Sequence, residues 1–244
     1  MKKRIYFLLL SVVFIFSSCK DKSNEFVEQL FTDTQITAAL NMCADTTIAK
    51  TCNTLCIVDS MNQKLGYYYF ESESYRIEFS ADMQQIADTL VAHGYQDKVD
   101  SLRYFLNRAA EQCGNKITQF WKPIIKDMAY PNPNLVLHGG NNAITDYFKI
   151  HKQNEFVVSL LSFINEQFVA LDVYLLWDNI RETYTDITGI TPPTSALNPL
   201  LTPTAEKMAA GFFKKMGIEE EAIRKYPDLR GNPNGLLYRV FATL

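Results

Sequence analysis

Residues 155–185, EFVVSLLSFINEQFVALDVYLLWDNIRETYT, form the most apolar stretch of the chain after residue 18, and they decide the fold class. Wound as an α-helix, this stretch presents large aliphatic and aromatic side chains on most of its sides. Such a helix is stable when other helices surround it. Charges at Glu166, Asp172 and Asp178 exclude a membrane span. The stretch therefore predicts the central helix of an all-α, multi-helix bundle.

The rest of the chain supports this class, because apolar residues recur at helical spacing on both sides of the central stretch. Further helices are predicted at residues 33–56, 80–93, 99–128, 143–152, 202–216, 219–225 and 234–241. Gly114 and Pro123 mark expected breaks, and the four prolines of residues 188–204 predict a long loop.

Residues 66–80 follow a different pattern. Two runs of aromatic and β-favouring residues, Tyr67–Phe70 and Tyr75–Phe79, flank a short polar segment. This pattern predicts a small extended or hairpin element. Packing of alternate rings on the helices beneath is the favoured interpretation; exposed rings would instead form a binding hot spot.

The first residues have the pattern of an export signal. Lys2, Lys3 and Arg4 precede an apolar run, Ile5–Phe16, that is too short to span a bilayer. Residues 1–18 are predicted to be a signal peptide that is removed. Residues 19–32 would then be an anchor and tether, and residues 33–244 a single helical domain.

The sequence Phe16-Ser-Ser-Cys19 resembles the lipobox of bacterial lipoproteins, in which the cysteine receives acyl chains and becomes the new N-terminus. The resemblance implies that the chain is held on a membrane through lipidated Cys19 in the cell envelope. Lys20 stands where an aspartate would retain an enterobacterial lipoprotein at the inner membrane, so the outer membrane is favoured. The leaflet stays open between periplasmic and surface-facing.

Charge excludes one class of partner. The full chain has a formal charge of −3, and removal of residues 1–18 with their three basic residues gives −6. Basic residues elsewhere form only pairs such as Lys214 and Lys215. Nucleic acid is therefore not an expected partner, and no cofactor is predicted.

The four remaining cysteines, Cys43, Cys52, Cys56 and Cys113, suit an exported chain with one or two disulfides, and their three pairings stay open. Buried thiols are the other interpretation. No metal site is predicted, because there is no Cys-x-x-Cys or His-x-x-x-His pair.

Three motifs together resemble a known family. They are Leu106-Asn-Arg-Ala-Ala-Glu111, Gly139-Gly-Asn-Asn-Ala-Ile-Thr-Asp-Tyr-Phe148, and Ala210-Gly-Phe-Phe213 followed by residues 220–224 and by Arg230. In order and spacing they are similar to a bacterial envelope lipoprotein family known only as domain of unknown function 4197. The resemblance covers residues 33–244 and implies a mostly helical protein without an assigned activity.

The polar residues of these motifs are the candidate site. Arg108 and Glu111 are three residues apart, and Glu220 precedes Arg224 by four, so each pair suits an intrahelical ion pair. Arg224 and Arg230 could also reach buried carboxylates such as Asp146 or Glu111 and so join the last helices to the middle of the chain. A network that locks the fold is favoured over a site for an anionic headgroup or a peptide carboxylate. The candidate residues are Asn107, Arg108, Glu111, Asp146, Glu220, Arg224 and Arg230.

Three functions fit the sequence to different degrees. A membrane-anchored, non-catalytic helical interaction module with an envelope protein partner is favoured. The alternative is a carrier of an apolar or lipid-like ligand, in a helical cavity lined by residues 156–177. A hydrolase is disfavoured, since there is no Gly-x-Ser-x-Gly motif and the three histidines lie in unrelated contexts; His138 is the histidine to test.

Overall fold

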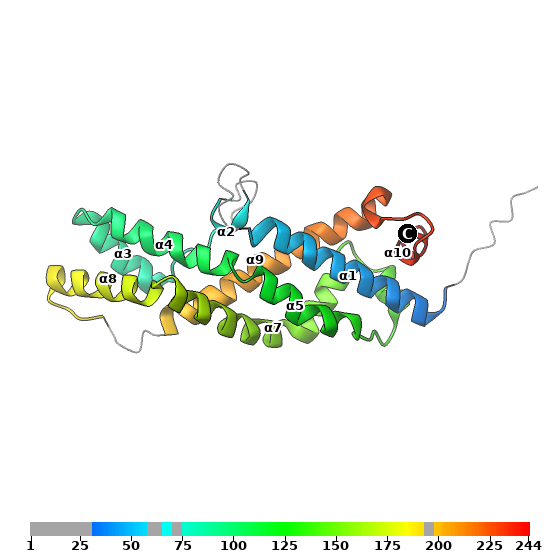
Figure 1. Cartoon of the computed structure of the whole chain (residues 1–244), viewed down its shortest axis with the longest axis horizontal. Coiled ribbons are helices and arrows are strands. Elements are labelled where there is room, and N and C mark those ends of the chain that lie inside the picture. Colours follow the sequence, from blue (N-terminus) through cyan, green and yellow to red (C-terminus); the bar gives the residue numbers. More distant parts are fainter. Residues whose placement is uncertain (1–30, 58–64, 70–74, 193–197) are drawn as a thin grey trace, which may run out of the picture. The chain divides into compact units, whose positions relative to one another are not determined.

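A computed structural model describes residues 31–57, 65–69, 75–192 and 198–244, and every regular element in these ranges is helical (Figure 1). In chain order the elements are α1 (Asp33–Leu55), α2 (Gly66–Tyr69), α3 (Ala81–Ala92), α4 (Gln96–Glu111), α5 (Gly114–Lys126), α6 (Pro133–Leu137), α7 (Ala143–Ala170), α8 (Val173–Thr188), α9 (Asn198–Lys225), the 3-10 helix η3 (Pro227–Arg230) and α10 (Leu236–Phe241). The predicted all-α bundle is confirmed.

Two sets of helices share one hydrophobic core. Helix α1 contacts α5, α6, α9 and α10, and α7 packs along α9 (Figure 1). Helix α8 lies against α3 and α4. Where α5, α7 and α9 meet, Trp121 contacts the rings of Phe148 and Phe156 at centroid distances of 5.3 and 5.4 Å, and Phe156 contacts Phe212 at 5.0 Å. Aromatic packing therefore fills the centre of the bundle.

The central stretch is two helices and not one. Helix α7 joins the predicted segment 143–152 to the first half of residues 155–185, and α8 contains the second half. They meet at a 72° bend, where Asp172 has a left-handed backbone with φ of 52°. Aspartate tolerates this conformation better than most residues. The single central helix was wrong, because apolar composition does not reveal that the two halves bury against different neighbours.

Two other helix boundaries that were predicted from prolines were also wrong. Pro123 lies inside α5 without ending it. Its ring removes one hydrogen bond to Gln119, but both residues are exposed, so water can satisfy that carbonyl. The chain breaks instead between Glu111 and Gly114. Likewise, α9 begins at Asn198 and runs to Lys225, so residues 198–204 of the predicted loop are helical.

The element near residues 66–80 is not a hairpin in its described part. Residues 66–69 form α2, and residues 70–74 lie outside the described residues. Tyr75, Ile77 and Phe79 are buried in alternation with exposed Arg76 and Glu78, which is the pattern of an extended segment. Residues 75–79 are called the extended arm below.

The N-terminal predictions fall outside the described residues. Residues 1–30 contain the predicted signal peptide, Cys19 and most of the tether. Among the described helices, none alone has the length and apolar composition of a membrane span; α7 and α8 reach that composition only when taken together across their bend.

Candidate functional site

The candidate polar residues form two separate buried clusters. Glu220, Arg224 and Arg230 make the α9 cluster, named after the helix that carries the first two. Asn107, Arg108 and Glu111 make the α4 cluster. All six side chains are buried although five are ionisable, so each must find its partners inside the protein. The seventh candidate, Asp146, belongs to neither cluster.

In the α9 cluster, Glu220 caps a helix from a distance. Its carboxylate accepts the backbone N–H groups of Ile144 and Thr145 at 2.9 and 2.7 Å, and the Thr145 hydroxyl at 2.8 Å. These N–H groups belong to the first turn of α7, which has no acceptor within its own helix. Burial raises the pKa of Glu220, and Arg224 and the three donors oppose that rise.

Arg224 completes this cluster by using all three of its nitrogens. Nε donates to Glu220 at 2.8 Å, and the two terminal nitrogens donate to the backbone oxygens of Leu137 and Val136 at 2.7 and 3.1 Å. The guanidinium also lies over the Phe241 ring, 5.5 Å from its centroid. One side chain thereby joins α9 to α6 and α10.

Arg230 closes the turn that follows α9. Its guanidinium donates to the backbone oxygens of Ile223 and Arg224, and burial lowers its pKa. The predicted contact of Arg224 or Arg230 with Asp146 was wrong, because Asp146 is exposed on α7 beside Lys149 and Ile150. Arg224 pairs instead with Glu220, which belongs to the same helix, α9.

A cavity of about 420 Å³ borders this cluster, lined by Arg224, Lys225, His138 and Leu244 among others. It is the place where an anionic headgroup or carboxylate would have to bind. The Arg224 nitrogens are already engaged with protein acceptors. This geometry favours the fold-locking interpretation over the ligand site at this cluster.

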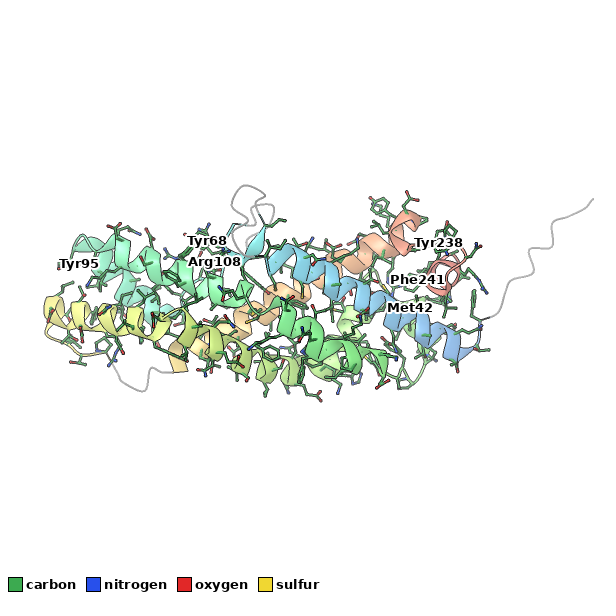
Figure 2. All side chains as sticks on the ribbon, viewed as in Figure 1. Met42, Tyr68, Tyr95, Arg108, Tyr238 and Phe241 are labelled. Carbon is green, nitrogen blue, oxygen red and sulfur yellow. The ribbon has the colours of Figure 1, made fainter. Side chains whose placement is uncertain are left out.

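The α4 cluster connects α4 with α2 and the extended arm. Arg108 and Glu111 form the predicted intrahelical ion pair. Glu111 also accepts the backbone N–H of Tyr68 at 2.9 Å, and Figure 2 shows Tyr68 and Arg108 together where α2 meets α4. The Gly66 backbone has φ of +87°, and a Cβ added there would lie 2.5 Å from the Glu111 carboxylate. Only glycine fits this approach.

Asn107 takes the place of a strand partner for the extended arm. Its Oδ1 accepts the Ile77 N–H at 2.8 Å, and its Nδ2 donates to the Ile77 oxygen at 3.0 Å. Both backbone groups of Ile77 are thereby satisfied without a sheet. A cavity of about 400 Å³ next to Glu111 is lined by Cys52, Cys56, Gly114 and Thr118 as well. The sequence shows the four-residue spacing of Cys52 and Cys56, but no pattern in it places these cysteines beside Glu111.

The remaining predictions concern the cysteines, a metal site and the histidines. The cysteines at 43, 52, 56 and 113 are all unbridged thiols, and burial raises the pKa of Cys113 to about 12. No group of three His, Cys, Asp or Glu side chains within the described ranges could hold a metal ion. All three histidines are exposed: His93 follows α3, His138 follows α6, and His151 lies on α7. His151 stacks on Tyr147, with ring centroids 4.2 Å apart.

The fold and the two clusters define the class as an all-α bundle braced by buried intrahelical ion pairs. Residues 32–242 match the family described as "Protein of unknown function (DUF4197)", and the chain belongs to this family. No curated protein and no solved structure matches the chain. The recognised motifs at residues 106–111, 139–148 and 210–230 contain both ion clusters, which lie inside the matched region.

Proposed function

We propose that this chain is a non-catalytic interaction module, anchored to the outer membrane through lipidated Cys19, that presents the outer side of α7 to another envelope protein. The anchor rests on the charged and apolar pattern of residues 2–16 and on the Phe16–Cys19 lipobox. The absence of a recognised catalytic motif in the sequence supports the non-catalytic part.

The observation that carries the proposal is an uncharged, exposed ridge along α7. Asn154, Val158, Ser162, Asn165 and Val169 follow one another at intervals of three or four residues, and all are exposed. Residues at this spacing share one face of a helix. Val158 and Val169 are 65% and 63% exposed, so this face presents two aliphatic side chains to solvent. Exposed Glu155 and Glu166 border this uncharged ridge, and an apolar centre with a polar rim suits contact with a protein partner.

The aromatic segment Tyr67–Phe70, named above as a hot spot if exposed, does not supply this surface. Tyr67 is fully buried, and its hydroxyl donates to the Met208 oxygen at 3.0 Å. Tyr68 is half-buried against Tyr104, and the side chains of residues 69 and 70 lie outside the described residues. The ridge on α7 is therefore the better candidate.

The carrier alternative has less support. The residues that would line its cavity pack against each other: Trp121 donates to Ser159 at 3.2 Å, and Phe156 lies 5.0 and 5.2 Å from Phe212 and Phe213. The four rings Trp121, Phe156, Phe212 and Phe213 are at most 4% exposed. A bound acyl chain would have to displace these rings.

Site-directed photocrosslinking in the native envelope tests the proposal. With a benzophenone side chain at position 158, we expect one discrete adduct with a single protein. The change Val169→Asp should abolish it, because a charge on the ridge must be desolvated on binding. The matched control is Leu175→Asp on α8, whose parent side chain is 58% exposed and lies off the ridge.

Either of two results would overturn the interaction module: no adduct at position 158, or an adduct that survives Val169→Asp. The anchor is tested separately with a clickable fatty acid, whose incorporation should disappear in Cys19→Ala. Fatty-acid labelling that persists in this variant would contradict the lipidation site.

A further inference from the structure

Three of the four cysteines lie together where the end of α1 meets the start of α5. Cys52 belongs to the last turn of α1, Cys56 follows that helix, and Cys113 precedes α5. The Cys56 thiol donates a hydrogen bond to the Cys52 sulfur. Cys113 donates to the Ala109 oxygen at 3.2 Å. The contact between Cys52 and Cys56 thus singles out one pair within the cluster.

Gly114 makes this arrangement possible. A Cβ added at Gly114 would lie 2.5 Å from the Cys56 Cβ and 3.6 Å from its sulfur. Any larger residue would push Cys56 away from α5. The first residue of α5 therefore holds the second thiol close to the first.

The two thiols border one cavity, although the Cys52 side chain is itself buried. Cys52 and Cys56 both line the cavity of about 400 Å³ next to Glu111, whose other walls include Asn53, Gln112 and Asn115. Cys56 is only half-buried. Cys113, in contrast, is fully buried and is not among the lining residues, and Cys43 lies nine residues earlier on α1.

We propose that Cys52 and Cys56 form a redox-active dithiol whose substrate is a low-molecular-weight disulfide that enters this cavity. This dithiol requires neither the lipid anchor nor the partner proposed above.

The reaction consists of two thiol–disulfide exchanges. The Cys52 thiolate attacks one sulfur of the external disulfide, forms a mixed disulfide and releases one thiolate of the substrate. The Cys56 thiol loses its proton, and its sulfur attacks the Cys52 sulfur and releases the second thiolate. Two protein thiols lose two electrons and two protons in total, and the external disulfide is reduced to two thiols.

The hydrogen bonds assign the attacking sulfur. The bond from Cys56 lowers the pKa of Cys52 and opposes the effect of burial. The pKa of Cys56 is raised, first by the bond that Cys56 donates to Cys52 and then by burial. The thiolate is the nucleophile in exchange, so Cys52 attacks first. The other titratable groups that face the pair are Glu111, Cys113 and Tyr67.

The backbone permits the bridge. Four residues along an α-helix separate two Cα atoms by about 6 Å, within the roughly 4.4–6.8 Å range of disulfides. Cys56 caps the end of the helix, with φ and ψ of −104° and 38°, and its shift toward Cys52 costs the terminal bond that its N–H donates to the Cys52 oxygen at 2.8 Å. A bridge over so short a span is readily reduced, as in labile and regulatory disulfides.

Peptide mapping tests the proposal on the full-length chain extracted from its membrane. The protein is equilibrated with glutathione disulfide, quenched in acid, alkylated and digested with trypsin. Cys52 and Cys56 fall in one peptide, residues 51–64, and Cys113 falls in residues 109–116. We expect the first peptide to be unalkylated and two hydrogens lighter than its reduced form. The second should carry one alkyl group.

Full alkylation of residues 51–64, or their linkage to residues 109–116, would overturn the proposal. In Cys56→Ser we expect a glutathione adduct that accumulates on Cys52; its absence would contradict the assigned order. Cys43→Ser on the same helix should change neither readout.

Discussion

The two ion clusters look alike in sequence and differ in construction. The α9 cluster pairs Glu220 with Arg224, and the α4 cluster pairs Arg108 with Glu111, each within one helix. In the α9 cluster, Glu220 reaches backbone groups of a helix 76 residues away in sequence. In the α4 cluster, Glu111 accepts the Tyr68 N–H of the short α2 and lies beside a cavity. The spacing of an intrahelical ion pair therefore does not reveal its burial, since the exposed Lys152–Glu155 pair has the same spacing as Arg108–Glu111. Nor does it reveal whether the other hydrogen bonds of the pair join distant helices or one local segment.

The largest expected effect is that of Glu220→Ala. It leaves Arg224 buried without its carboxylate and the first turn of α7 without acceptors, so unfolding should cost about 3–5 kcal/mol less. Urea unfolding of the chain measures this. The neighbouring exposed Glu221→Ala should change stability by less than about 0.5 kcal/mol. Equal effects of the two variants would refute the capping role.

Asn107→Ala tests the α4 cluster. It removes both bonds to Ile77, and each buried backbone group left without a partner costs about 1–3 kcal/mol. If the cluster is local, the extended arm should detach before the bundle unfolds. Limited proteolysis should then cut near residues 75–79 at urea concentrations where α9 stays protected. Cleavage of the extended arm and of α9 at the same urea concentration would contradict the local role of the α4 cluster.

Gly66→Ala measures how tightly Glu111 is enclosed. The left-handed backbone alone costs about 1–2 kcal/mol for a non-glycine residue. The added Cβ must also displace the carboxylate, so the loss should exceed about 2 kcal/mol. Gly94→Ala is the control, with φ of +89° and no atom within 4 Å of its added Cβ. The midpoint of thermal unfolding should fall further for Gly66→Ala than for Gly94→Ala. Equal falls would mean that the Glu111 side chain moves aside without a measurable loss of stability.

The smallest effect concerns pH. Burial raises the pKa of Glu220 in the folded state above the ordinary value of 4.5. Just above that value, the folded protein therefore binds more protons than the unfolded chain. The contribution of Glu220 to stability should grow as the pH falls into this window and decline as it rises. Urea titrations of wild type and Glu220→Gln from pH 7 to pH 5 should show wild type gaining relative to the variant.

Local patterns predicted part of this molecule well. Apolar periodicity located the buried faces of most helices, and three- and four-residue spacing identified both ion pairs, because these features arise within one helix. The bend at Asp172, the capping of α7 by Glu220 and the exposure of Asp146 were not predicted. Each depends on which distant helices pack together.

The same limit applies to the cavity beside Glu111. The sequence shows Cys52 and Cys56 one helical turn apart, but their contact with α5 depends on Gly114, and Glu111 arrives from α4. No periodicity relates these three elements. The number of cysteines indicates that a disulfide could form. Which two cysteines lie close enough to form it depends on how the helices pack.

The reach of Glu220 also bears on the order of folding. The amides of Ile144 and Thr145 can be protected only after α9 has docked, since the oxygens that they bind belong to that helix. Closing the intervening loop costs entropy before any contact repays it. Hydrogen exchange at these two amides therefore reports the docking of α9, while amides farther along α7 report formation of the helix itself.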